Sequence, residues 1–473
     1  MNKFIKFYFL GIGGIGMSAL ARYFRAKGFQ VAGYDRTETK LTSELQAEGI
    51  EISFIEDVEQ IPFVYTKAEN TLVILTPAIP ENHPQLIYFK ENNFSILKRA
   101  EVLGKITRQS KGICIAGTHG KTTTSTITAH LLYQSRVSCS AFLGGIANNY
   151  NTNLLISKES NLVVIEADEY DRSFHQLSPY MAVITSADPD HLDIYKNATA
   201  FRESFEHFTS LIRPGGALIM RKGIDIVPQL QKGVKLYTYS MDEGGDFSAE
   251  NIRSEKGEIR FDFVTPTDRI NDVRLGVPVR INVENSVAAM AMAWLNGVSS
   301  EEIRTGISSF SGIYRRFNTV YKSNDIVYMD DYAHHPSELK ASISSIRNLY
   351  PDKKITGIFQ PHLYTRTRDF ASEFANALSQ LDELILLDIY PARELPIDGV
   401  SSDLILNEVK LQNKVRCSNE NLLALLKDKK MEVLVTFGAG DIDKMVPKIK
   451  DLLKSQAVLK NNSEDITQVS NIL

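Results

Sequence analysis

Residues 112–124 read Gly-Ile-Cys-Ile-Ala-Gly-Thr-His-Gly-Lys-Thr-Thr-Thr, and this stretch decides the fold. The apolar run Gly112–Ala116 predicts a buried strand, and a helix is expected to follow and continue through Tyr133. Between them lies a glycine-rich turn, whose backbone N–H groups can surround phosphate oxygens at the positive end of the helix dipole. The pattern therefore predicts a binding site for nucleotide phosphates.

Two side chains in this turn have the chemistry that a bound triphosphate requires. Lys121 can reach the β- and γ-phosphates, and the Thr122 hydroxyl can bind Mg²⁺. The strict form of the motif places glycine at position 115, where this chain has Ile115, so the loop is a shortened variant. The alternative is a threonine-rich helix start with an incidental Gly-Lys pair. The strand before the turn and the helix after it favour the phosphate site.

Acidic residues follow two later strands. Glu166 comes directly after the apolar run Leu162–Ile165, where a carboxylate suits a Mg²⁺ ion beside phosphates. His191 lies among carboxylates in Asp188–Asp193, after the strand Ala182–Thr185. A lone histidine is usually structural, but this setting indicates a second metal held partly by His191. The expected metal ligands are Thr122, Glu166 and His191.

A second glycine-rich turn, Gly11-Ile-Gly-Gly-Ile-Gly16, lies between the strand Phe7–Leu10 and the helix Met17–Lys27. Asp35 ends the next strand, 24 residues after Gly11 (35 − 11). Alone, this pattern is a dinucleotide fingerprint and suggests NAD. The same geometry can hold the diphosphate of a nucleotide sugar. Two nucleotide sites on one chain indicate an ATP-driven reaction on a nucleotide-linked substrate.

Short apolar strands alternate with helical segments along the chain, which is typical of α/β proteins with parallel sheets. A chain of 473 residues is too long for one core, so two to four domains are expected, with boundaries near 108 and 314. The polar stretch Ser240–Gly257 indicates loops and an antiparallel excursion. The apolar part of the strand described first is Ile113–Ala116, and the further strands expected are Thr71–Leu75, Ile326–Met329, Ile355–Phe359, Glu383–Leu387 and Glu432–Phe437.

Composition excludes several classes of protein. The net charge of −4 gives no basic field for nucleic acid, and no apolar run reaches the roughly 20 residues that span a bilayer. The three cysteines, Cys114, Cys139 and Cys417, lack C-x-x-C spacing, which argues against disulfides or a zinc site. Free thiols in a reducing cytoplasm are expected, with Cys114 in the core.

These motifs together resemble the Mur ligase family, which builds the peptide of peptidoglycan. The resemblance covers essentially the whole chain, in order. The segments that carry it are Gly11–Ala21, Ala116–Thr124, Glu166–Phe174, Asp188–Tyr195, Tyr314–Asn318, Asp330–Glu338, Phe359–Asp369, Tyr390–Val400 and Phe437–Ile442.

The resemblance implies three domains, with ATP as co-substrate and Mg²⁺ as cofactor. A Rossmann-like domain over 1–108 would bind a UDP-sugar, a central P-loop domain with a mixed or parallel sheet over 109–314 would bind ATP, and a Rossmann-like domain over 315–473 would bind an amino acid and close on ATP. The pattern is most similar to family members that join L-alanine to the lactyl carboxylate of UDP-N-acetylmuramate through an acyl phosphate. No nucleic acid or membrane insertion is expected.

The resemblance also implies a role for each matching residue. The ATP-binding set is Gly117, Thr118, His119, Gly120, Lys121, Thr122, Thr123, Asn282, Asn285, Arg316 and Asp331. The UDP-sugar set is Gly11, Gly13, Gly14, Gly16, Asp35, His83 and Arg99. The amino-acid set is Tyr332, His334, His362 and Arg366. The catalytic set is Lys121, His191, Arg316 and His335, with His191 or His335 as the general base.

The chain departs from the family pattern at three places. Ile281 stands where the family usually has histidine, and Leu363 where it usually has arginine after His362, which shifts weight to Arg366. Some relatives carry a carbamylated lysine after the His191 motif, and none is expected here. The alternatives are a recycling ligase that attaches a whole peptide, a Rossmann oxidoreductase, and a nucleotide sensor without catalytic activity.

Overall fold

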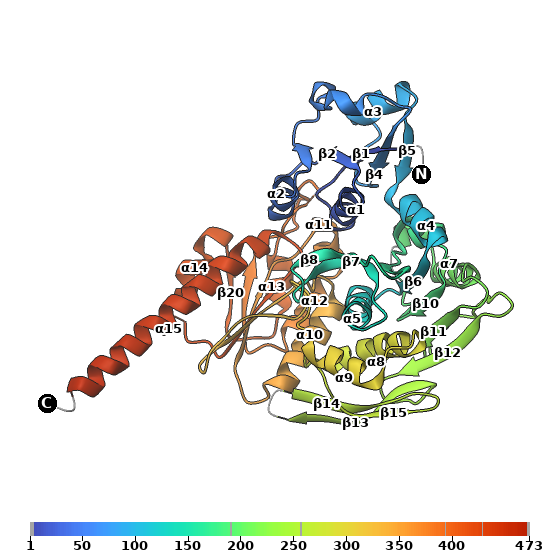
Figure 1. Ribbon diagram of the computed structural model, residues 1–473. Coiled ribbons are helices and arrows are strands. Elements are labelled where there is room, and N and C mark those ends of the chain that lie inside the picture. Colours follow the sequence, from blue (N-terminus) through green and yellow to red (C-terminus); the bar gives the residue numbers. More distant parts are fainter. Residues whose placement is uncertain (1–3, 190–191, 256–257, 393, 428, 471–473) are drawn as a thin grey trace. The chain divides into compact units, whose positions relative to one another are not determined.

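The computed structural model describes residues 4–189, 192–255, 258–392, 394–427 and 429–470. The chain forms two compact units (Figure 1). The first comprises Met1–Val277 with Asn282–Ser311, and the second Pro278–Ile281 with Gly312–Leu473. The first unit contains two sheets and the second contains one, and the expected α/β fold class is confirmed.

The first sheet is entirely parallel, with strand order β3-β2-β1-β4-β5. From β1, the strands up to β3 extend the sheet to one side, and β4 and β5 extend it to the other. The point between β1 and β4 where this order reverses is a topological switch point, and α/β sheets bind ligands at such points. The turn at Gly11–Gly16 leaves the end of β1 at this point. The elements are β1 (Lys6–Leu10), α1 (Ile15–Ala26), β2 (Gln30–Tyr34), α2 (Lys40–Ala47), β3 (Glu51–Ser53), β4 (Thr71–Leu75), α3 (Pro84–Glu91), β5 (Ser95–Lys98) and α4 (Arg99–Gln109), with 3-10 turns at Val58–Gln60 and Phe63–Tyr65.

The second sheet has ten strands in the order β15-β14-β13-β12-β11-β10-β6-β9-β7-β8. Its centre is parallel, and both edges are antiparallel, including β13 against β14 in the polar region after Ser240. The strands are β6 (Lys111–Ala116), β7 (Ser140–Ala147), β8 (Thr152–Leu155), β9 (Leu162–Glu166), β10 (Met181–Ile184), β11 (Ala217–Arg221), β12 (Lys235–Ser240), β13 (Phe247–Glu255), β14 (Glu258–Val264) and β15 (Arg269–Arg274). The helices are α5 (Lys121–Tyr133), α6 (Leu192–Tyr195), α7 (Ala198–Ser210), α8 (Arg280–Leu295) and α9 (Ser300–Ser309), with a 3-10 segment, η3, at Tyr170–Gln176.

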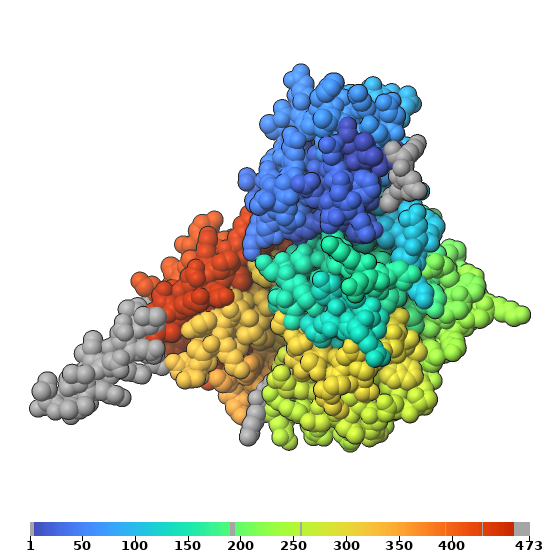
Figure 2. Space-filling model, in the orientation of Figure 1, coloured from blue at the N-terminus to red at the C-terminus, as the bar shows by residue number. Residues whose placement is uncertain are grey.

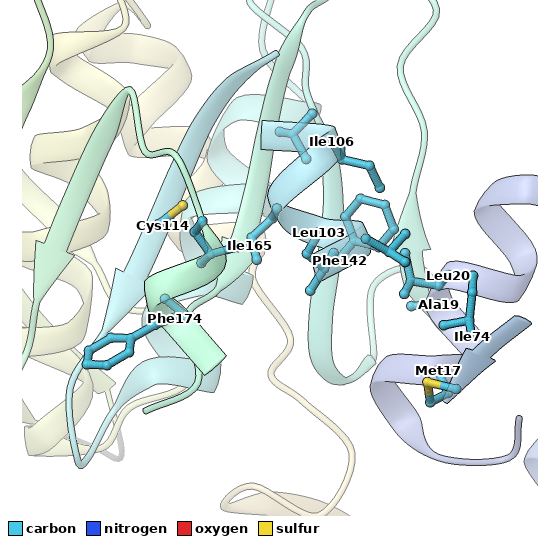
Figure 3. Close-up of a cluster of buried hydrophobic side chains, with 14 of the residues drawn as sticks. Met17, Ala19, Leu20, Ile74, Leu103, Ile106, Cys114, Phe142, Ile165 and Phe174 are labelled. Carbon is cyan, nitrogen blue, oxygen red and sulfur yellow. The ribbon is translucent and has the colours of Figure 1, made fainter. Parts of the chain in front are cut away.

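One apolar core joins these two sheets. Met17 and Leu20 of α1 lie in the same buried cluster as Phe142 of β7 and Ile165 of β9 (Figure 3). In the space-filling view the first sheet's domain, in blue, rests directly on the green residues of the second (Figure 2). A buried hydrogen bond of 2.6 Å from Arg22 Nη1 to Asn153 Oδ1 ties α1 to β8. Separating the two domains would expose apolar side chains and a buried polar pair, so they are held as one unit.

The second unit is built on a six-stranded sheet with order β16-β17-β21-β18-β19-β20, parallel except for the edge strand β16. Its strands are β16 (Asn318–Lys322), β17 (Val327–Asp331), β18 (Ile355–Phe359), β19 (Glu383–Leu387), β20 (Lys414–Cys417) and β21 (Val433–Phe437). Its helices are α10 (Pro336–Leu349), α11 (Tyr364–Asp369), α12 (Ala371–Leu378), α13 (Asp403–Glu408), α14 (Asn419–Lys427) and α15 (Met445–Ser470), with a 3-10 turn at Asp441–Lys444. Buried clusters cover both faces of this sheet.

The three cysteines are buried free thiols, as expected from their spacing. Cys114 lies in β6 at the centre of the second sheet, and burial raises the pKa of its thiol far above the ordinary value. Within the described ranges, no helix combines the length and apolar character needed to cross a bilayer.

His130 gives the first unit a pH-dependent stability. It is buried in α5, with Nδ1 2.8 Å from the Tyr150 hydroxyl and Nε2 3.0 Å from Ser309 Oγ. Burial lowers the pKa of His130 to about 4 from 6.5. The unfolded chain therefore binds more protons between these values, so the free energy of unfolding falls as pH drops from 6.5 to 4, by at most about 1.4 kcal/mol per pH unit.

Urea unfolding across this pH range measures the effect, and His130→Gln should flatten the slope. The exposed His207→Gln is the matched control and should leave it unchanged. An equal slope in the wild type and the His130 variant would contradict the assignment.

Candidate active site

The glycine-rich turn Gly117–Gly120, called the phosphate loop below after its predicted ligand, joins β6 to α5 in the first unit. Its backbone is left-handed at Gly117 (φ +139°) and at Gly120 (φ +79°), which precedes the first residue of α5. A Cβ at position 117 would lie 2.0 Å from the Thr185 hydroxyl oxygen, so only glycine fits there. The loop and helix expected from the sequence are therefore in place, and the N–H groups at the start of α5 have no side-chain cap.

Lys121 is held over its own loop. Its ammonium group donates to the carbonyl oxygens of Gly117 (2.6 Å) and Thr118 (3.2 Å), and to Glu169 Oε1 (2.7 Å). Glu169 is only 2% exposed, and burial raises the pKa of its carboxyl to about 7, against the opposing effect of the Lys121 ammonium. A solvated acidic loop after β9 would account for Glu169 from sequence alone, but the structure shows that Glu169 is a buried counter-ion of Lys121.

The segment that follows β10 is hydrogen-bonded to the phosphate loop. The Thr185 hydroxyl donates to His119 O at 2.5 Å, and the Ser186 hydroxyl accepts from His119 N at 2.8 Å. The Thr118 hydroxyl donates to the carbonyl oxygen of Asp188 at 2.7 Å. The sequence interpretation missed Thr185 and Ser186, although hydroxyls directly after a strand beside the loop were a signal for them.

Asn285 connects α8 to the loop's helix. Its Oδ1 accepts from the Thr124 hydroxyl at 3.3 Å, and its Nδ2 donates to Asn282 Oδ1 at 3.2 Å. Both asparagines are nearly buried, whereas Ile281, which replaces the family's histidine, is 49% exposed. The structure thus brings the two asparagines to the phosphate loop, which is consistent with their expected place near the nucleotide.

Glu166 has the properties of a ligand for a hard cation. It ends β9, and its Oε2 is buried with no hydrogen-bond partner among the described residues. The carboxylate lies against Gly144 of β7, where a Cβ would be 1.9 Å from Oε2. Thr122, 8% exposed, is the second residue of α5. An unsatisfied carboxylate oxygen and a hydroxyl are the donors that Mg²⁺ prefers, so these residues fit the ion.

His191 lies outside the described residues, so its expected roles as metal ligand and base stay predictions. Within the described part of the chain, no group of three or more histidine, cysteine or acidic side chains could hold a metal by itself. A Mg²⁺ ion shared between protein and phosphates needs fewer protein ligands, as is usual for nucleotide sites.

The turn at Gly11–Gly16 is closed by Asp35, whose Oδ2 accepts from Gly13 N at 2.7 Å. The guanidinium group of Arg99 lies against the backbone of Gly16 at the start of α1 and donates to Asp168 at 3.1 Å. The structure therefore gathers the glycines, Asp35 and Arg99. His83 is 3% exposed beside the Tyr34 ring, and both of its ring nitrogens are buried without hydrogen-bond partners in the described residues.

The second unit contains the arginine pair. Arg315 is buried with a left-handed backbone (φ +62°), and it donates to Asp330 Oδ2 at 3.2 Å and to Gly438 O at 2.5 Å. Arg316 is partly exposed, and its guanidinium lies 5.1 Å from the centre of the Tyr332 ring. The two adjacent arginines therefore differ: Arg315 is a fixed structural cation, and Arg316 remains available to a ligand. The sequence interpretation did not assign Arg315.

Asp331, the residue expected at the ATP ribose, is at the end of β17. Its Oδ2 accepts from the Ser342 hydroxyl of α10 at 2.6 Å. Burial raises the pKa of the Asp331 carboxyl, against the opposing effects of Ser342 and Arg316.

The four residues expected at the amino acid cluster around the ends of β17 and β18. The ring centres of Tyr332 and His334 are 5.1 Å apart, and those of His334 and His362 are 6.1 Å apart. Arg366 Nη1 donates to His362 Nδ1 at 3.4 Å. The ring of Tyr390, which sequence reasoning did not assign to a site, stacks on His362 at 5.8 Å. The cluster combines the Arg366 guanidinium with imidazole and phenol rings, which suits a small zwitterion.

Two neighbouring residues have different roles. Leu363, at the family's arginine position, has φ +72°, and its N–H donates to Tyr390 O at 3.0 Å, so its backbone contributes to the shape of the cluster. His335 caps α10: its Nδ1 accepts from Ser337 N at 3.4 Å, and its ring lies 5.2 Å from the Phe370 ring. Capping engages Nδ1 of His335, one of the two residues expected as general base.

The fold and the loop around Lys121 define the class of this protein, a nucleotide-dependent enzyme with an α/β phosphate-loop domain. Three family models match consecutive parts of the chain. "Mur ligase family, catalytic domain" matches residues 6–111, "Mur ligase middle domain" matches 115–293, and "Mur ligase, glutamate ligase domain" matches 315–440.

Similar proteins agree with these matches. The UDP-N-acetylmuramate–L-alanine ligase of Parabacteroides distasonis is 58% identical over 96% of this chain and 99% of its own length, and that of Cytophaga hutchinsonii is 46% identical over 95% and 97%. The solved UDP-N-acetylmuramate–alanine ligase of Thermotoga maritima superposes with a TM-score of 0.81 at 27% identity, covering 95% of this chain and 99% of that one. The chain belongs to the Mur ligase family.

Proposed function

We propose that this protein joins the amine of L-alanine to the lactyl carboxylate of UDP-N-acetylmuramate, with conversion of ATP to ADP and phosphate, in peptidoglycan synthesis. The observation that carries the proposal is 58% identity over 96% of the chain to a ligase named for this reaction. The phosphate loop and its lysine supply the ATP chemistry that such a ligation requires.

The chemical problem is that a carboxylate is a poor electrophile in water. Transfer of the ATP γ-phosphoryl group to the carboxylate forms an acyl phosphate, which an amine can attack. The lysine Lys121 and the arginine Arg316 supply positive charge for the transferring group, and the loop N–H groups orient the phosphates. Thr122 and Glu166 would hold Mg²⁺, with His191 as a further proposed ligand, and the ion would neutralise phosphate charge.

The substrate subsites are assigned on the same basis. Gly11, Gly13, Gly14 and Gly16, with Asp35 and Arg99, form the proposed UDP-sugar site at the switch point of the first sheet. Tyr332, His334, His362 and Arg366 form the proposed alanine site in the second unit.

Phosphate release in the presence of ATP, Mg²⁺ and UDP-N-acetylmuramate tests the function, with amino acids supplied one at a time. Alanine should give the highest rate. Serine and glycine should react measurably, because a pocket for one methyl group discriminates by only about 1–3 kcal/mol. Equal rates for alanine and phenylalanine would refute a small-residue pocket.

A tripeptide arm in the same assay separates this function from that of a recycling ligase. A murein peptide ligase of Psychrobacter arcticus shares the fold, with a TM-score of 0.66 at 21% identity over 95% of this chain and 98% of that one. Faster release with the tripeptide than with alanine would overturn the proposal. A thermal shift with NADH but not with ATP and Mg²⁺ would favour an oxidoreductase, and ATP binding without substrate-dependent release would favour a sensor.

A further inference from the structure

His334 has a fixed tautomer. Its Nδ1 lies 3.0 Å from the carbonyl oxygen of Tyr332 and 3.3 Å from Glu338 Oε2. A carbonyl oxygen and an ionised carboxylate can only accept hydrogen bonds, so Nδ1 must carry the proton. The lone pair is therefore on Nε2, which has no hydrogen-bond partner among the described residues.

The surroundings keep this imidazole neutral before reaction. Burial lowers the pKa of His334 below its ordinary value, and the nearby Arg366 and Arg316 lower it further. Glu338 and the Tyr332 carbonyl oppose this shift. Among the described residues, the rings of Tyr332 and His362 also lie near this imidazole, and His362 Nδ1 accepts from Arg366. At neutral pH the ring is thus in the state that accepts a proton.

Glu338 is placed to stabilise the imidazolium once it forms. Its Oε2 accepts from the backbone N–H groups of His334 (3.0 Å) and His335 (3.3 Å), which fix the carboxylate at the start of α10. The same oxygen lies on the Nδ1 side of His334. A carboxylate behind a histidine holds the tautomer and stabilises positive charge on the ring.

We propose that His334 is the general base that deprotonates the incoming alanine amine, acting through Nε2. This rests on the proposed function. The His334 side chain is 23% exposed and lies among Tyr332, His362 and Arg366, so a small amino acid can reach it. Neighbouring His335 is engaged in capping α10, which leaves His334 as the better placed of the two.

The proton balance of the step is complete. The alanine ammonium gives one proton to Nε2, and the freed electron pair forms a C–N bond at the acyl phosphate carbon. The C–O bond to phosphate then breaks, and phosphate leaves with that electron pair. The second N–H proton passes to solvent, which leaves an amide, and the imidazolium later releases its proton to solvent.

The test compares two nucleophiles in His334→Asn, because the asparagine amide can still donate to the Tyr332 carbonyl while Nε2 is lost. Alanine-dependent phosphate release should fall about 10²–10⁴-fold at neutral pH. Hydroxylamine, which is largely unprotonated there, needs no base, so capture of the acyl phosphate as a hydroxamate should stay at the wild-type rate. This capture also shows that the variant is folded and binds both nucleotides.

A pH series separates a base from a binding contact. The deficit of His334→Asn with alanine should shrink as pH rises, because more alanine is already deprotonated. The exposed His207→Asn is the control for loss of a histidine and should keep wild-type turnover. A deficit that is the same at every pH, a rise in the alanine KM alone, or unchanged alanine turnover would overturn the proposal. If the wild-type enzyme itself formed neither amide nor hydroxamate, the proposed function would fail instead.

Discussion

Lys121→Ala is expected to lower ATP-dependent phosphate release about 10³-fold. The Lys121 ammonium group donates to two carbonyl oxygens of the phosphate loop, at 2.6 Å and 3.2 Å. Among the described contacts, no other side-chain cation does so. In the transition state the transferring phosphoryl group carries spread negative charge, and removal of this cation leaves the charge without its main protein counterpart. Phosphate release with saturating UDP-N-acetylmuramate and alanine measures the effect.

The structure requires a second variant beside this one. Lys121→Ala also removes the cation from the buried Lys121–Glu169 ion pair, and removal of one member of a buried ion pair destabilises the fold. The double variant Lys121→Ala with Glu169→Gln removes both charges of the buried pair, so it should regain stability without regaining turnover. Replacement of the exposed Lys232 with alanine is the control for general loss of charge. Wild-type turnover in Lys121→Ala would remove the basis of the proposed chemistry.

Substitution of the two adjacent arginines should have opposite consequences. Arg315→Ala leaves Asp330, which is fully buried, without its cation, so the free energy of unfolding of the second unit should fall by about 3–5 kcal/mol. Arg316→Ala removes a partly exposed side chain, so stability should change little. Its turnover should fall about 10³-fold or more, because an arginine that neutralises a transferring phosphoryl group contributes that much.

Urea unfolding and phosphate release, measured on both variants, check this contrast. Each arginine is the matched control for the other, since they are neighbours of the same type and charge. A stable, inactive Arg315→Ala together with an unstable, active Arg316→Ala would show that the roles are reversed.

Local sequence accounts for much of the architecture. A β-branched run followed by glycines and a helix start is a signal contained within about a dozen residues, because sterics and periodicity act over that range. The strands around Ile113, Ile355 and Val433 were therefore predictable, as was the phosphate loop at Lys121. The resemblance extended this to the site residues, most of which the structure gathers into three groups, although their roles stay predictions.

What only the tertiary structure decided is how charges are paired. Glu169 and Lys121 are 48 residues apart, and Arg315 and Gly438 are 123 apart, so neither contact leaves a local pattern. The same holds for the proton on His334, because its position depends on two acceptors that the fold brings close to Nδ1. Short-range sterics fix strands, turns and helices along the chain. The state of a buried charge depends on desolvation and on its partners, and these exist only after distant segments have packed together.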